Sequence, residues 1–145
     1  MVQICQMTLQ DFKSIENEFA TNFDPFWNTQ IFLEELGNTN SNYFIAKQEN
    51  EIVGVIGIKI VLEQADIMNV ITRKDKRKQG IATSLIYHSI AYCKKCNCAT
   101  IFLEVNEHNH SAISLYQKIG FVEITRRRKY YDGVADAIIM TYTLS

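Results

Sequence analysis

Residues 67–83 read Ile-Met-Asn-Val-Ile-Thr-Arg-Lys-Asp-Lys-Arg-Lys-Gln-Gly-Ile-Ala-Thr. An apolar, strand-like run leads into a cationic turn, and a glycine stands where a helical pattern begins. A helix N-terminus presents backbone N–H groups without intrahelical partners, and the helix dipole adds partial positive charge there. The stretch therefore predicts a strand–turn–helix unit that can bind phosphate groups.

The glycine of this turn, Gly80, lacks a Cβ, so the main chain can approach a ligand closely. Mobile cations suited to several phosphates surround it, namely Arg73, Lys74, Lys76, Arg77 and Lys78. A solvated basic turn is the simpler alternative, because clusters of surface Lys and Arg are common. The strand–turn–helix context favours the phosphate site.

Length and composition indicate one globular domain spanning residues 1–145. The chain is 47% hydrophobic and 21% charged, which is ordinary for a folded domain of 145 residues. No apolar run approaches the roughly 20 residues that span a bilayer, and the first residues lack the features of a signal peptide. We expect a cytoplasmic protein without membrane association.

Four cysteines are read as reduced thiols in that compartment. They are Cys5, Cys93, Cys96 and Cys98. The spacing of the last three suggests zinc as an alternative, but a second ligand pair at metal spacing is missing. We therefore expect no metal.

Charge is unevenly distributed although the net charge is −1. Residues 1–69 contain 3 Lys and Arg against 10 Asp and Glu, whereas residues 70–145 contain 12 against 6. The basic half fits a polyanionic cofactor, and the acidic half can attract a cationic substrate, unless its charge is incidental. Residues 126–129, Arg-Arg-Arg-Lys, are a local nucleic-acid possibility, but the acidic total disfavours one, and we expect no direct contact.

Hydrophobic periodicity and capping residues predict the order of elements along the chain. Helices are expected to begin after Thr8, at Pro25, after Gly80 and after Asn109. Strands are expected at residues 2–7, 43–47, 52–61, 64–72, 99–105, 121–125 and 135–143, with a cationic and aromatic loop at 126–133. The helix after Gly80 should bury one face, made of Ile81, Leu85, Ile86, Ile90 and Cys93. This order indicates a mixed α/β fold.

Residues 77–82, Arg-Lys-Gln-Gly-Ile-Ala, resemble the Q/R-x-x-G-x-G/A pyrophosphate signature of the GNAT acetyltransferases. The downstream segments 103–105, 112–121, 127–131 and 136–140, together with Asn109, resemble the RimI-like ribosomal-protein alanine N-acetyltransferases. Enzymes of that group transfer acetyl from acetyl-CoA to the α-amine of a protein, in the founding case a small-subunit ribosomal protein. Lys74, Ala82 and Asn106 depart from the group's pattern, and the change at Asn106 weakens a claim to the same acceptor.

The resemblance implies a central, mostly antiparallel, twisted sheet with a parallel splayed pair at the acetyl-CoA cleft, flanked by about four helices. It implies acetyl-CoA as co-substrate, a protein N-terminus as acceptor, and a monomer or weak dimer. The implied acetyl-CoA contacts are Val70, Ile71, Thr72, Arg77, Lys78, Gln79, Gly80, Ile81, Ala82, Thr83 and Asn109.

Two side chains suit the chemistry of acetyl transfer. An α-amine has a pKa of about 7.7 to 8.0 in peptides, so part of it must lose a proton before it attacks a thioester. Glu104, at the end of an apolar strand, is the candidate base, directly or through one water; a carboxylate paired with a lysine is the alternative. Tyr116 is the candidate proton donor to the leaving thiolate, with a core tyrosine as the alternative, and backbone N–H near Ile71 would hold the carbonyl oxygen.

The acceptor cleft is expected between residues 126–133 and the first two helices, by the same resemblance. Tyr130 and Tyr131 can bind a peptide through their rings and hydroxyls, or simply pack the loop onto the sheet. Basic residues of the acceptor can be attracted by Glu16, Glu18, Asp24, Glu34 and Glu35. Two other functions stay open: a small-molecule amine acetyltransferase and a non-catalytic acetyl-CoA-binding regulator, the latter disfavoured by the presence of Glu104 and Tyr116.

Overall fold

One seven-stranded sheet forms the centre of the computed structural model, which describes residues 2–19, 21–23, 37–131 and 133–144. Its strands are β1 (Gln3–Gln6), β2 (Ser41–Gln48), β3 (Glu51–Val61), β4 (Gln64–Thr72), β5 (Thr100–Asn106), β6 (Val122–Tyr131) and β7 (Ala135–Thr143). Their order across the sheet is β1-β2-β3-β4-β5-β7-β6, and neighbours are antiparallel except for the parallel pair β4 and β5. The predicted mixed α/β fold is confirmed.

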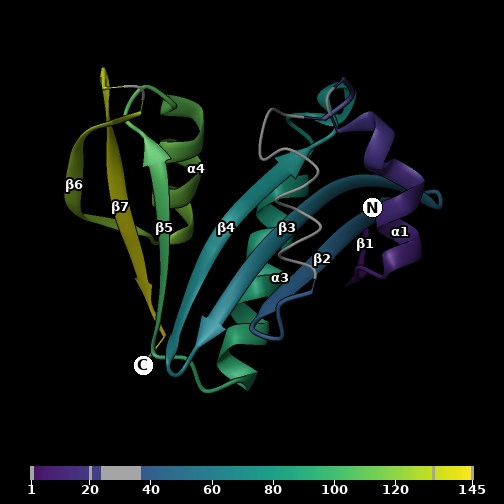
Figure 1. Ribbon diagram of the computed structural model, residues 1–145, viewed down its shortest axis with the longest axis horizontal. Coiled ribbons are helices and arrows are strands. Elements are labelled where there is room, and N and C mark those ends of the chain that lie inside the picture. Colours follow the sequence, from purple (N-terminus) through teal and green to yellow (C-terminus); the bar gives the residue numbers. More distant parts are fainter. Residues whose placement is uncertain (1, 20, 24–36, 132, 145) are drawn as a thin grey trace.

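The parallel pair is short and then splays. Strands β4 and β5 pair from Gln64 opposite Thr100 to Ile67 opposite Leu103, and beyond these residues they diverge, as Figure 1 shows. Both strands continue, β4 to Thr72 and β5 to Asn106. The splay leaves the ends of two neighbouring strands facing each other without pairing, which confirms the predicted opening in the sheet.

Helices cover the two faces of the sheet. Helices α3 (Ile81–Lys95) and α4 (His110–Ile119) pack on one face, where the main apolar core includes Leu85, Ile86 and Tyr116. Helix α1 (Leu9–Ile15), followed by the 3₁₀ turn η1 (Glu16–Glu18), packs on the other face of β2, β3 and β4 through Phe12 and Ile15. The burial of both apolar stripes explains why these segments are helical.

Local capping signals agree with the structure. The Thr8 side chain accepts a hydrogen bond from Asp11 N at 3.1 Å, and the Asp11 carboxylate accepts one from Thr8 N at 2.9 Å, forming a capping box. The buried face predicted for α3 is also confirmed. The helix predicted to begin at Pro25 lies outside the described residues.

In the described ranges, no helix is both long and apolar enough to cross a membrane.

The prediction of a loop at residues 126–133 is wrong for residues 126–131, because strand β6 continues to Tyr131, whereas Gly133 lies in a turn. The prediction rested on the cationic residues of this segment. However, β6 is an edge strand, and Lys and Arg are common on exposed edges because they discourage pairing with further strands. Ion pairs link it to β7 and to β5, including Arg126 to Asp136 at 3.9 Å and Arg127 to Glu104 at 3.3 Å. A hydrogen bond from Val134 N to Tyr131 O, 3.0 Å, closes the hairpin to β7.

Candidate active site

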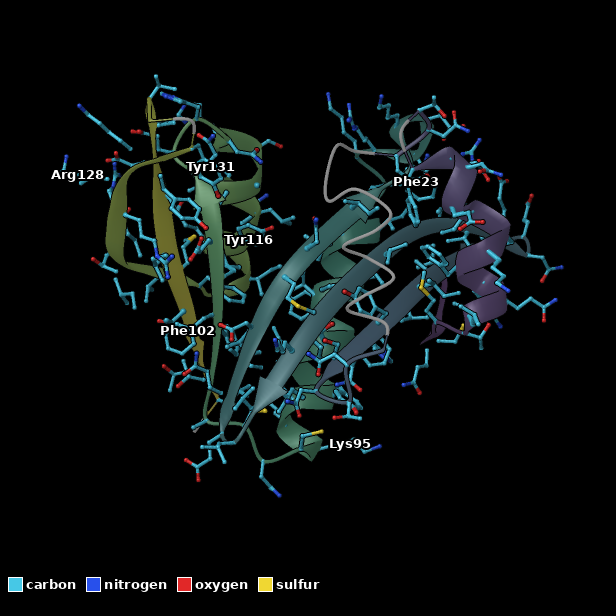
Figure 2. All side chains as sticks on the ribbon, viewed as in Figure 1. Phe23, Lys95, Phe102, Tyr116, Arg128 and Tyr131 are labelled. Atoms are coloured by element: carbon cyan, nitrogen blue, oxygen red, sulfur yellow. The ribbon has the colours of Figure 1, made fainter. Side chains whose placement is uncertain are left out.

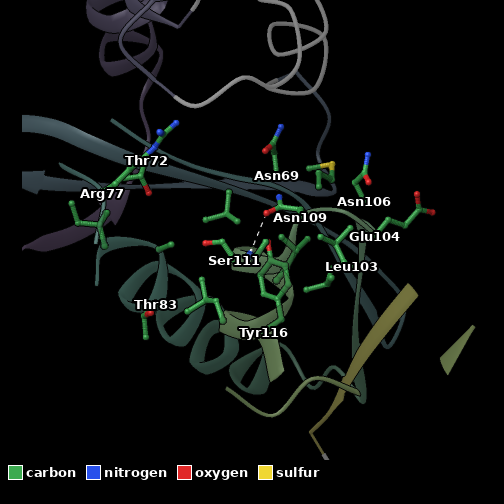
Figure 3. Close-up of a pocket in the computed structure, with 18 of the residues that line it drawn as sticks. Asn69, Thr72, Arg77, Thr83, Leu103, Glu104, Asn106, Asn109, Ser111 and Tyr116 are labelled. Atoms are coloured by element: carbon green, nitrogen blue, oxygen red, sulfur yellow. Dashed lines mark hydrogen bonds between the residues drawn. The ribbon is translucent and has the colours of Figure 1, made fainter. Parts of the chain in front are cut away.

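A cavity of about 1050 Å³ lies where β4 and β5 splay, and Figure 3 shows many of its walls. This volume suits a ligand of cofactor size. Strand β4, the turn before α3, the first turn of α3, strand β5 and helix α4 line it. The lining residues are Ile67, Met68, Asn69, Val70, Thr72, Lys76, Arg77, Lys78, Gly80, Ile81, Ala82, Thr83, Leu103, Glu104, Val105, Asn106, Asn109, Ser111, Ala112, Leu115, Tyr116 and Tyr131.

The N-terminus of α3 opens into this cavity. Gly80 is the N-cap residue with φ 78°, and no side chain of the described residues caps the helix. A Cβ on Gly80 would meet no atom within 4 Å, so the left-handed backbone, rather than crowding by the protein, is the local reason for glycine. Lys78 is also left-handed at φ 65°, which is strained for a residue with a Cβ. The turn thus exposes N–H groups at a helix start, an arrangement suited to phosphate oxygens.

Only part of the predicted cationic cluster faces the cavity. Lys76, Arg77 and Lys78 line it. Arg73 does not, because its guanidinium is bound to Glu18 at 2.7 Å, Asp75 at 2.9 Å and Glu51 at 3.5 Å. The hydrogen bond to Glu18 raises the pKa of Arg73. The expected role of Arg73 around the phosphates is therefore wrong, whereas the part of Glu18 in attracting an acceptor stays a prediction.

Backbone groups of β4 contribute the wall opposite β5. Arg73 N donates to Val53 O on β3 at 2.8 Å. Successive N–H groups of a strand point to opposite edges of that strand. The N–H group of Ile71 therefore points to β3, and the N–H groups of Val70 and Thr72 point to the splayed side. Ile71 itself is buried on the α1 face of the sheet and, like Gln79, is not among the lining residues.

Glu104 projects from the opposite face of β5 to Leu103 and Val105, which lie in the core beside α4. Its side chain is 33% exposed, and Arg127 Nη2 on β6 lies 3.3 Å from its Oε1. The partner of this carboxylate is therefore an arginine from a distant strand rather than a lysine. In Figure 3 the Glu104 side chain extends away from the Tyr116 ring.

Tyr116 lies on α4, lines the cavity and is 8% exposed. Its ring packs against Phe121, with centroids 5.9 Å apart. Burial, assisted by nearby Tyr131, raises the pKa of Tyr116 to about 12. Its hydroxyl is therefore neutral at pH 7 and can donate a hydrogen bond or a proton.

The two adjacent tyrosines of β6 differ in position. Tyr131 lines the cavity, and burial, with the nearby Glu104 charge, raises the pKa of Tyr131. It interacts electrostatically with both Glu104 and Tyr116. Tyr130 is 52% exposed and is not among the lining residues. Its ring stands edge-on to Tyr131 at 5.3 Å, with the Arg127 guanidinium 5.4 Å from its centroid.

Asn109 caps α4, accepting a hydrogen bond from Ala112 N at 3.2 Å, and it also lines the cavity. Sequence reasoning missed the polar lining residues Asn69 and Ser111 and several apolar ones, although all of them lie on elements that it identified.

Among the described residues, no group of three or more His, Cys, Asp or Glu side chains is arranged to bind a metal ion. Cys93 and Cys98 are buried and Cys5 and Cys96 exposed, all as free thiols.

This fold, with its cavity at a splayed parallel pair, defines the class of protein. The chain belongs to the acetyltransferase (GNAT) family, whose model matches residues 9–121. It is an acetyl-CoA-dependent N-acetyltransferase, as predicted.

Particular relatives are known for this chain. It is 34% identical over 122 residues to the ribosomal protein bS18-alanine N-acetyltransferase of Escherichia coli K12, covering 82% of each chain. It is 30% identical over 141 residues to the putative enzyme of the same name from Bacillus subtilis 168, covering 96% of this chain and 93% of that one. The crystal structure of the ribosomal-protein-S18-alanine N-acetyltransferase from Escherichia coli matches with a TM-score of 0.91 and 30% identity, covering 100% of this chain and 95% of that one. The predicted resemblance is confirmed.

Proposed function

We propose that this enzyme transfers the acetyl group of acetyl-CoA to the α-amine of a protein N-terminus, with ribosomal protein bS18 as the leading candidate acceptor. One observation carries the proposal: a single cavity joins the N-terminus of α3, Glu104 on β5 and Tyr116 on α4. The names of the relatives in Escherichia coli and Bacillus subtilis support the choice of acceptor.

Acetyl-CoA fits the chemistry of the cavity. Its phosphates would meet the N–H groups of the first turn of α3 and the cations Lys76, Arg77 and Lys78. Val70 and Thr72 would supply backbone N–H groups along β4, and Asn109 a side-chain amide at the start of α4. The apolar walls from Leu103, Val105 and Leu115 suit the less polar part of the molecule.

Acetyl-CoA supplies a thioester whose carbonyl carbon accepts the amine nitrogen while the C–S bond breaks and the sulfur leaves as a thiolate. Glu104 accepts a proton from the acceptor amine, directly or through one water, and so makes the nitrogen lone pair available. Arg127, now paired with that carboxylate, must yield its place to the incoming ammonium group. The amine therefore approaches from the face of the sheet to which the side chains of Glu104 and Arg127 project.

Tyr116 donates its hydroxyl proton to the departing thiolate, and the second proton lost by the acylated nitrogen restores the Tyr116 hydroxyl. Its pKa of about 12 keeps the proton on oxygen across the physiological range, so the donor is always loaded before reaction. Tyr131 stands near both Glu104 and Tyr116, and its hydroxyl can bind the acceptor beside the reacting amine. Tyr130, being exposed beside Arg127, would contact only more distal residues of the acceptor.

The acceptor class is tested by measuring coenzyme A release with four acceptor conditions. They are a peptide with the N-terminal sequence of bS18 and a free alanine amine, the same peptide already acetylated, spermidine, and no acceptor. We expect release with the free peptide only. Robust release with spermidine but with no peptide would instead identify a small-molecule amine acetyltransferase.

The base is tested by Glu104→Gln, which keeps size and hydrogen bonding but removes basicity. Loss of one positioned base costs about 10² to 10⁴ in rate, so turnover should fall by that order while the KM for acetyl-CoA changes little. Glu123→Gln is the matched control, because Glu123 also pairs with an arginine of β6 and does not line the cavity. Turnover of Glu104→Gln close to wild type across pH 6 to 9 would reject Glu104 as the base.

A further inference from the structure

Strand β6 contains a bulge beside the cavity. Arg127 pairs with Ala137 of β7, and the next paired residues are Tyr131 and Ala135. The single residue Asp136 of β7 thus stands opposite three residues of β6, namely Arg128, Lys129 and Tyr130. Lys129 has φ 50°, a left-handed backbone that is unfavourable for a residue with a Cβ. A bulge with such a residue needs stabilisation from its surroundings.

The bulge determines which side chain enters the cavity. In a regular antiparallel ladder that continued from Arg127 opposite Ala137, Lys129 would stand opposite Ala135. With the two extra residues, Tyr131 stands there instead and lines the cavity near Glu104 and Tyr116. Figure 2 shows the result: Arg128 lies at the outer edge of β6, whereas Tyr131 lies close to the end of β5.

The side chain of Asp136 holds the left-handed backbone of Lys129 in place. Its Oδ1 accepts a hydrogen bond from Lys129 N at 2.9 Å, and its side chain is only 12% exposed. Its own backbone is bonded to Glu107, the residue after β5, because Asp136 N donates to Glu107 Oε2 at 2.6 Å and Glu107 N donates to Asp136 O at 3.0 Å. Arg126 and Arg128 lie 3.9 and 3.8 Å from its Oδ2. The carboxylate is therefore held rigidly at the centre of the bulge.

We propose that Asp136 is a positioning residue for the acceptor site: its hydrogen bond to Lys129 N maintains the bulge that places Tyr131, rather than Lys129, in the cavity. The inference rests on the proposed function, since it assigns Tyr131 to the acceptor. The physical reason is that this hydrogen bond offsets the cost of the left-handed backbone at Lys129. A lysine in the place of Tyr131 would add a second cation near Glu104, besides Arg127, and increase the repulsion of the acceptor ammonium.

The test compares Asp136→Ala with Asp136→Asn, since the amide of Asn keeps an oxygen that can accept from Lys129 N. In Asp136→Ala the KM for the free-amine peptide should rise up to about tenfold, the effect of losing one intramolecular hydrogen bond, while the KM for acetyl-CoA is unchanged. Asp136→Asn should stay close to wild type in both constants. Glu123→Ala is the matched control, because Glu123 shares the partner Arg126 but does not touch the bulge.

A second measurement does not depend on activity. Hydrogen exchange of the Lys129 amide, followed by NMR, should show protection in the wild type and in Asp136→Asn, and faster exchange in Asp136→Ala. If the wild type acetylates no peptide, the proposed function fails, while this measurement still decides the role of Asp136.

Three outcomes would overturn the inference. They are an unchanged peptide KM in Asp136→Ala, a Lys129 amide that exchanges equally in all variants, and a peptide KM raised as much in Asp136→Asn as in Asp136→Ala. If Asp136→Ala does not fold, Asp136→Asn decides: a wild-type peptide KM with a protected Lys129 amide supports the inference, and any other result refutes it.

Discussion

Replacing Tyr116 with phenylalanine removes the proposed proton donor and keeps the ring. Tyr116 is 8% exposed and its ring packs against Phe121, so phenylalanine can occupy the same space. If Tyr116 is the general acid, turnover should fall by about 10² to 10⁴ while the KM for acetyl-CoA changes little. Turnover close to wild type in Tyr116→Phe would refute that role.

The structure also gives a magnitude for the effect of burying this hydroxyl on the free energy of unfolding. The pKa of Tyr116 is raised from 10.0 to about 12, so the folded state binds the proton more tightly than the unfolded state does. The associated stability is complete below pH 10 and is lost as the pH rises through 12. Two pKa units correspond to about 2.7 kcal/mol in total, of which about 1.3 kcal/mol is lost between pH 9 and pH 11.

Urea denaturation of the wild type and Tyr116→Phe at pH 9 and pH 11 measures this term. The wild type should lose about 1.3 kcal/mol more free energy of unfolding than the variant, because phenylalanine carries no titrating group. Tyr87→Phe is the matched control, since Tyr87 is 53% exposed on α3. Equal losses in the wild type and Tyr116→Phe would show that the hydroxyl is not held in a dry environment.

Two further predictions concern glycines. Gly80→Val places a β-branched residue at φ 78° at the start of α3, and it should weaken acetyl-CoA binding in calorimetry; Gly133→Val is the matched control, because Gly133 has φ 71° and open space like Gly80 but does not line the cavity. Unchanged acetyl-CoA affinity in Gly80→Val would place the phosphate site elsewhere. Gly54→Ala puts a Cβ 2.7 Å from Ile81 Cγ2 and 3.0 Å from Leu85 Cδ1, so these side chains must move or α3 must shift away from β3. Such overpacking should lower the free energy of unfolding in urea by about 1 to 3 kcal/mol, and an unchanged value would show that the helix adapts freely.

The sequence by itself determined the features that depend on neighbours three or four residues apart. Thr8 with Asp11 and Asn109 with Ala112 form helix caps within single turns, so their residue types predict the helix starts. The buried face of α3 follows from spacing alone, because one face of a helix must meet the sheet. The strand–turn–helix unit around Gly80 is local in the same sense. The resemblance of its motif to a known family added the expectation of a splayed sheet.

Tertiary structure alone decided which of the candidate side chains meet. Arg73 and Glu18 are far apart in sequence, and their ion pair removed a cation that the local pattern had assigned to phosphate. Arg127 pairs with Glu104, and the hydrogen bond from Lys129 N to Asp136 accompanies the bulge that separates Tyr131 from Tyr130. Long-range strand pairing and register fix these contacts. A residue's type shows what bonds it can form, but only the arrangement of the whole sheet selects the partner.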